Sequence, residues 1–203
     1  MNTAFAPLFT LQRSHGIAHE PIELTDGRLV ELAPVNPQDA SAERAFVGAL
    51  SLTSRYRRFH FGLRELSPEA AQAMTEIDQH HHVAFVARAA DDDAAAIVAD
   101  ARYVMRADSA DAEFAIAVAD DWQGVGLGRA LLMRLAAQAR ANGVQRLFGD
   151  VLWGNPSMLA LMRSLGAKLR RLPGDSTVVR VEFEFELSEN LANEVRSAPA
   201  PRS

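Results

Sequence analysis

The stretch from Phe114 to Ala141 constrains the fold of this chain more than any other. Residues 114–119 have the apolar content of a buried strand, and residues 123–128 read Gln-Gly-Val-Gly-Leu-Gly. An apolar helix face then repeats every four residues, at Leu127, Leu131, Leu135 and Ala139. Glycine permits backbone conformations that a Cβ forbids, and a helix N-terminus attracts anions through its free N–H groups and its dipole. The sequence therefore predicts a strand, a phosphate-binding turn and a helix in succession.

Two known phosphate-binding motifs fit this turn poorly. A nucleotide-hydrolase loop ends in Gly-Lys-Ser/Thr, but the only lysine of the chain is Lys168. A dinucleotide site needs G-x-G-x-x-G directly after a strand, whereas residues 124–128 form G-x-G-x-G and residues 120–123 separate them from the strand. Asp150 lies at a distance along the chain that suits a ribose-binding acid, so the dinucleotide alternative stays open.

The composition narrows the class of protein. A chain of 203 residues with 48% hydrophobic and 23% charged residues is typical of one soluble globular domain. The net charge of −5 argues against broad nucleic-acid binding. With no cysteine, disulfides and thiolate chemistry are excluded, which fits a reducing compartment. There is no long apolar run and no basic N-terminal leader, so we expect a cytoplasmic protein without a membrane partner.

Periodicity and turn residues predict a mixed α/β layer fold built on one sheet. The chain divides into an N-terminal arm (1–22), one domain (23–188) and a tail predicted to be disordered (189–203). Strands are predicted at 29–32, 83–90, 95–105, 113–118, 144–153 and 179–187. Helices are predicted at 37–50, 67–77, 127–141 and 155–165. Residues 83–105 read as an antiparallel hairpin around an aspartate turn.

The spacing Gln123-x-x-Gly126-x-Gly128 at a strand-to-helix junction resembles the acetyl-CoA-binding motif of the GNAT N-acetyltransferase superfamily. The resemblance extends from about Arg28 to Leu187, and it implies one mixed, mostly antiparallel central sheet with helices on both faces. It also implies that backbone N–H groups of residues 124–130 hold the coenzyme A pyrophosphate. The implied cofactor contacts come from Ala117, Val118, Ala119, Gln123, Gly124, Val125, Gly126, Leu127, Gly128, Arg129, Ala130 and Asn155.

A narrower resemblance is to the acetyltransferase domain of bacterial Pat-type protein lysine acetyltransferases. Residues 51–59 are similar to their S-x-x-S-x-x-x-R-F segment, and residues 113–115 match the start of their cofactor strand. The resemblance implies that Glu113 is the general base and that the acceptor is a protein lysine, such as one on acetyl-CoA synthetase. An amine with a pKa of ~10.4 needs such a base at neutral pH. Glu113 could also be an exposed glutamate at the end of a strand.

Three features leave alternatives open. Met162 stands where many relatives carry a tyrosine that protonates the leaving thiolate. Residues 55–61 could line the acceptor groove, or could form a helix that packs its aromatic rings inward and leaves its arginines in solvent. The run His80-His81-His82 invites a metal hypothesis, but adjacent side chains rarely point at one ion, so we predict a polar loop and no metal.

The predicted function is N-acetyl transfer from acetyl-CoA to a primary amine within a ternary complex. A small-molecule amine, such as a polyamine or an amino acid, is the alternative acceptor. A coenzyme A sensor without catalysis is an alternative of a different class, and the missing tyrosine is the feature that favours it.

Overall fold

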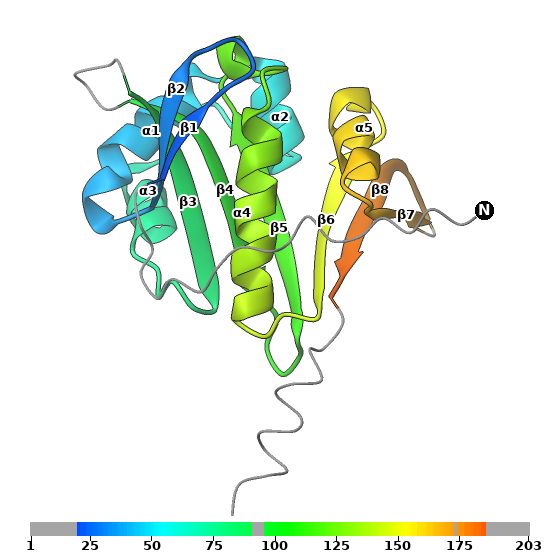
Figure 1. The fold of residues 1–203 in the computed structure, drawn as a ribbon. Coiled ribbons are helices and arrows are strands. Elements are labelled where there is room, and N and C mark those ends of the chain that lie inside the picture. The colour runs from blue at the N-terminus through cyan, green and yellow to red at the C-terminus, as the bar shows by residue number, and fades with distance from the viewer. Residues whose placement is uncertain (1–19, 91–95, 173, 186–203) are drawn as a thin grey trace, which may run out of the picture.

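The structure, a computed structural model, describes residues 20–90, 96–172 and 174–185 (Figure 1). One sheet of eight strands has the order β1-β2-β3-β4-β5-β6-β8-β7, and only β5 and β6 pair in parallel. The strands are β1 (Glu20–Glu23), β2 (Leu29–Pro34), β3 (His82–Ala89), β4 (Ile97–Met105), β5 (Asp111–Val118), β6 (Arg146–Leu152), β7 (Lys168–Leu172) and β8 (Asp175–Glu184). This confirms the predicted mixed, mostly antiparallel sheet.

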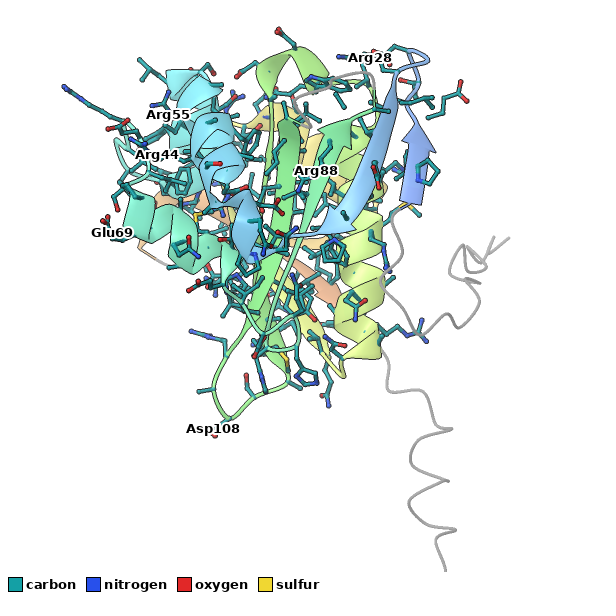
Figure 2. All side chains as sticks on the ribbon, turned by 90° about the vertical axis from the view of Figure 1, so that its left-hand side faces the viewer. Arg28, Arg44, Arg55, Glu69, Arg88 and Asp108 are labelled. Atoms are coloured by element: carbon teal, nitrogen blue, oxygen red, sulfur yellow. The ribbon has the colours of Figure 1, made fainter. Side chains whose placement is uncertain are left out.

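Helices cover both faces of the sheet, as predicted. The α-helices are α1 (Ala40–Ala49), α2 (Leu52–Phe59), α3 (Pro68–Thr75), α4 (Leu127–Ala141) and α5 (Pro156–Ser164). Short 3-10 turns, η1 (Pro37–Asp39) and η2 (Asp120–Trp122), precede α1 and α4. Figure 2 shows the sheet edge-on, with α1 and α3 on one side and α4 on the other. None of the helices in the described ranges is long and apolar enough to cross a bilayer.

Two apolar clusters fill the two layers. The larger one joins α4 and α5 to the sheet and includes Leu131, Leu135 and Met162. The smaller one joins α1 and α3 to the other face and includes Phe46 and Ala71. Alternation along the strands sends successive side chains to the two clusters, so each strand of the middle of the sheet is covered on both faces.

Two edge strands were not predicted. The first, β1, pairs with β2 and includes residues 20–22, which were expected to belong to the arm. The other, β7, reads Lys-Leu-Arg-Arg-Leu and pairs with β8. Both are short and polar, and edge strands of this kind have little of the apolar alternation on which a sequence prediction depends. The predicted aspartate turn and the C-terminal tail lie outside the described residues.

The parallel pair β5–β6 separates soon after it forms. Its partners are Asp111–Glu113 and Arg146–Phe148, and beyond these residues the two strands no longer pair. Figure 1 shows them spreading apart towards the ends beside α2 and α5. Gly149 lies where they diverge: a Cβ there would come within 2.9 Å of the Phe114 ring. Phe114 therefore fills the gap at the base of the divergence, and the space beyond it stays open.

Candidate active site

The separated ends of β5 and β6 form the floor of a cleft of about 650 Å³. Its walls come from α2, the glycine turn, the first turn of α4 and the start of α5. Nine predicted site residues line it: Glu113, Ala117, Val118, Gln123, Gly124, Gly126, Gly128, Arg129 and Asn155. Residues from two strands, three helices and the glycine turn thus meet in one cavity.

The glycine turn has the backbone that its sequence predicts. Gly124 and Gly126 have φ of 78° and 93°, a left-handed region that other residues rarely adopt. Gly126 is the N-cap of α4, and no side chain caps that helix. The N–H groups of the first helical turn therefore have no side-chain acceptor, and they carry the positive end of a helix of 15 residues beside the cleft.

Gln123 fixes the turn to its surroundings. Its Nε2 donates to the Val118 carbonyl at 3.0 Å and to Ser54 Oγ at 3.2 Å. Asp120 accepts hydrogen bonds from the Ser51 backbone and from both serine hydroxyls at the start of α2. Partial burial opposes the effect, but these hydrogen bonds hold the pKa of Asp120 below its usual value. Asp120 therefore joins the turn that precedes the glycines to the start of α2.

The edge of β5 that faces β6 has no strand partner beyond Glu113 in the described sheet. Backbone groups of an antiparallel strand alternate in direction, so those of Ile116 and Val118 face the cleft, whereas those of Ala117 face β4. An extended ligand could bond, as an added strand does, to the groups that Gln123 leaves free. Ala119 differs, because its N–H donates to the Val98 carbonyl and its own carbonyl accepts from Trp122. The protein itself satisfies both backbone groups of Ala119.

Three of the predicted contact residues lie outside the lining of the cleft. Leu127 is fully buried in the core, and Val125 packs against the same core. The N–H of Ala130 already donates to the Gly126 carbonyl. None of these three lines the cleft.

The start of α5 forms the wall opposite α2. Asn155 caps this helix, since its Oδ1 accepts from the Met158 N–H at 3.3 Å, and this leaves its amide NH₂ available for a ligand. Met158 and Leu161 face the cleft, whereas Met162 is fully buried. Among the described residues no tyrosine lines the cleft.

Glu113 lies exposed on β5 and lines the cleft. On the neighbouring strands, Asp150 accepts two hydrogen bonds of 2.8 Å from Arg180. These bonds, together with the charges of Asp150 and Glu113, raise the pKa of Arg180. Asp150 is thus committed to an ion pair at the cleft, a contact that its sequence position alone does not reveal.

The helix α2 corrects in part the interpretation that the rings of residues 55–61 pack inward: Phe59 does pack against the smaller apolar cluster, but the other rings do not. Tyr56 and Phe61 are 51% and 58% exposed, so these rings do not pack inward. The side chain of Arg58 is only 13% exposed, so this arginine does not remain in solvent. The cleft is lined by Arg57, Arg58, Phe59 and His60. In a helix of eight residues, side chains one turn apart share a face. The sequence of α2 shows this spacing, but it does not show which face of the helix is buried.

The three histidines lie outside the cleft. Asp78 accepts hydrogen bonds from the backbone N–H groups of His80, His81 and His82, and these bonds strongly lower its pKa. The run is thus a turn organised by one carboxylate. No three histidine or carboxylate side chains in the described part of the chain come together as a metal site.

Comparison with known proteins agrees with this geometry. The sequence profile of the Acetyltransferase (GNAT) family matches residues 49–167. Acetyltransferase PA5475 of Pseudomonas aeruginosa is 35% identical over 156 residues, which cover 77% of this chain and 84% of that protein. Acetyltransferase Pat of Mycolicibacterium smegmatis is 34% identical over 150 residues, which cover 72% of this chain but only 44% of Pat.

A solved structure shows the same arrangement of elements. The GNAT domain of S. lividans PAT superposes with a TM-score of 0.75 at 28% identity, covering 82% of this chain and 97% of that domain. The family match spans more than half of the chain and includes the glycine turn, both walls of the cleft and Glu113. The chain therefore belongs to the GNAT family of acetyltransferases.

Proposed function

We propose that the cleft binds acetyl-CoA and that the protein transfers its acetyl group to a primary amine by direct attack. One observation carries the proposal: the uncapped N-terminus of α4 and the unpaired edge of β5 face the same cleft. The first suits a pyrophosphate and the second suits an extended amide chain. Coenzyme A joins these two groups in one molecule.

The residues that would hold acetyl-CoA are those whose hydrogen-bonding groups at the cleft have no partner within the described part of the protein. Backbone N–H groups from Gly124 to Arg129 would bind the pyrophosphate, where the left-handed glycines let the backbone approach it. The Val118 N–H would bond to a pantetheine amide, since Gln123 already holds the Val118 carbonyl, and Ala117 lines the cleft beside it. The Asn155 amide would donate from the opposite wall. Bound in this way, acetyl-CoA supplies an activated thioester carbonyl between the two strands.

Glu113 is the proposed general base. It would take a proton from the acceptor ammonium, directly or through a water, and so free the nitrogen lone pair. The nitrogen then bonds to the thioester carbonyl carbon, the carbon–sulfur bond breaks, and the electron pair leaves on sulfur. The nitrogen loses its second proton to solvent, from which the thiolate is protonated to the thiol. A thiolate with a pKa near 8.5 can leave without a dedicated acid. This agrees with a cleft that no described tyrosine lines.

The proposed acceptor is a protein lysine, such as one on acetyl-CoA synthetase. The support is the likeness of residues 51–59 and 113–115 to Pat-type enzymes and the identity to acetyltransferase Pat. The exposed Tyr56 and Phe61 lie beside the cleft-lining part of α2, where a protein acceptor would arrive. A small-molecule amine remains the alternative acceptor.

Calorimetry with acetyl-CoA and with NAD tests the binding step. We expect heat with acetyl-CoA and none with NAD; the reverse result would contradict the proposal. A thiol-release assay with purified acetyl-CoA synthetase, and with polyamines and free amino acids, tests the transfer step. Binding of acetyl-CoA without release of thiol on any acceptor would instead favour a sensor. Comparison of acetyl-lysine proteomes with and without the protein would then identify protein acceptors.

A further inference from the structure

The three arginines of α2 have different partners. Arg55 donates to the Gly48 and Leu50 carbonyls at the end of α1. Arg57 donates to the Gly154 carbonyl across the cleft at 3.2 Å. Arg58 lines the cleft, lies over the Phe59 ring, and forms an ion pair of 3.9 Å with Asp100, but makes no hydrogen bond to any residue in the described ranges. A mostly buried guanidinium carries five N–H donors, and such groups are normally satisfied.

The carboxylate nearest Arg58 is already committed to another arginine. Asp100 is 1% exposed and accepts from Arg102 at 3.0 and 2.6 Å. Arg102 also donates to Glu43 at 3.1 Å. Burial, together with the charge of Asp100, raises the pKa of Glu43 to about 8, so this carboxyl is mainly neutral near pH 7. Two guanidiniums, those of Arg58 and Arg102, therefore share the Asp100 carboxylate.

The surrounding elements do not remove this excess positive charge. On β3, burial lowers the pKa of His82, which keeps that imidazole neutral. Asp39 and Arg88 form an ion pair of 2.7 Å whose charges cancel. One positive charge thus stays uncompensated at the cleft wall, and Arg58 is the member of the group that lines the cleft.

The anion that compensates Arg58 is not the pyrophosphate. The β4–β5 register sets Asp100 opposite Ala117 and Arg102 opposite Ala115, so this cluster shares a sheet face with Glu113. The start of α4 packs on the other face, where Gly128 lies next to the Ile116 and Val118 side chains. Arg58 therefore lies on the face of the proposed base, and the anion that it meets belongs to the acceptor.

We propose that Arg58 determines acceptor specificity by binding a carboxylate that the acceptor carries close to its reactive amine. The inference rests on the proposed function. The acceptor is then either a lysine beside an acidic residue or a small amine with a free carboxylate. Arg58 holds the carboxylate through two N–H donors, and Glu113 takes the proton from the amine.

Two matched pairs of acceptors test the inference in a thiol-release assay at saturating acetyl-CoA. One pair is two end-blocked peptides with a single lysine whose neighbour is glutamate in one and glutamine in the other. The other pair is Nα-acetyl-lysine and its methylamide. We expect kcat/KM to favour the carboxylate member of at least one pair by about tenfold or more, since each of the two charge-assisted hydrogen bonds contributes about that factor. The pair that responds distinguishes a peptide acceptor from a small amine.

Variants assign the preference to Arg58. In Arg58→Gln we expect the preference to fall within twofold of unity. In Arg58→Lys we expect it to be intermediate, because lysine keeps the positive charge but not the paired N–H donors of the guanidinium. Arg57→Gln, one position earlier on α2, should keep the ratio. The ratio compares two acceptors on one preparation, so a partly unfolded variant does not distort it. A wild type without preference, or a preference that survives Arg58→Gln, would overturn the inference. Absence of transfer to every amine would contradict the proposed function itself.

Discussion

Ser54 and Asp120 join the two walls of the cleft: Ser54 Oγ donates to Asp120 Oδ1 at 2.7 Å across 66 residues of sequence. Ser51 adds two more hydrogen bonds to the same carboxylate, and its hydroxyl also caps α2. One carboxylate therefore fixes both the start of α2 and the turn that leads into the glycines. While these hydrogen bonds hold, α2 and the glycine turn cannot move independently.

Asp120→Ala should loosen both walls together. We expect it to lower the free energy of unfolding by about 1 kcal/mol, as loss of a helix cap does, and to weaken acetyl-CoA binding several-fold. Urea titration and calorimetry measure the two effects. Asp121→Ala is the matched control, because Asp121 contributes its backbone carbonyl, not its carboxylate, to the bond with Arg28. Equal behaviour of the two variants would show that the link does not matter.

Gly126→Ala should impair the phosphate-binding turn. Its φ of 93° puts an alanine side chain in a strained conformation, although its nearest neighbour would be 3.6 Å away. We expect a cost of roughly 1–2 kcal/mol in stability and a larger fall in acetyl-CoA affinity. Gly48→Ala, on the exposed side of α1, should instead be neutral or stabilising. Acetyl-CoA affinity equal to wild type in Gly126→Ala would remove this turn from the binding site.

Gly149→Ala tests the divergence of β5 and β6. The added Cβ would meet the Phe114 ring at 2.9 Å and its carbonyl oxygen at 3.1 Å. We expect a loss of about 1–3 kcal/mol in the free energy of unfolding, typical of overpacking. Phe114→Leu in the same chain should recover part of it, which a double-mutant cycle measures. Additive effects of the two substitutions would show that the ring does not hold the strands apart.

Glu43 should make stability depend on pH. Its pKa is raised to about 8 in the folded protein, mainly by burial, and is near its usual value when unfolded. The folded state then binds a proton that the unfolded state has lost, so the stabilisation is complete below about pH 4 and is lost as the pH rises towards 8. Glu43→Gln should flatten this fall in thermal midpoint, whereas Glu65→Gln, on an exposed side chain, should not. Identical pH profiles for wild type and Glu43→Gln would contradict the assignment.

The cofactor side of the cleft could be predicted from the sequence because its signals are local. Gly124 and Gly126, the helix after them and the Asn155 cap occupy short, continuous segments whose residue types dictate the backbone. Periodicity likewise placed Glu113 on the strand that enters the turn. The conformation of each of these elements is set by residues close to it in the sequence, so it can be predicted without knowing the fold.

The acceptor side could not be predicted in the same way. Glu43, Arg58, Asp100 and Arg102 come from three elements and meet only where α1 and α2 pack against β4. Buried charges leave no apolar periodicity, and an arginine in a sequence is expected in solvent. The Asp150–Arg180 pair has the same origin, since antiparallel pairing of β6 and β8 brings it together.

Glu113→Gln tests the central claim most directly, with Glu184→Gln on an exposed part of β8 as the control. Single-turnover acetyl transfer to the best acceptor and acetyl-CoA calorimetry are measured on both. The account predicts a fall in the transfer rate of about 100-fold or more for Glu113→Gln, with acetyl-CoA affinity within twofold of wild type. The control should match wild type in both. A transfer rate for Glu113→Gln within threefold of wild type would contradict the account.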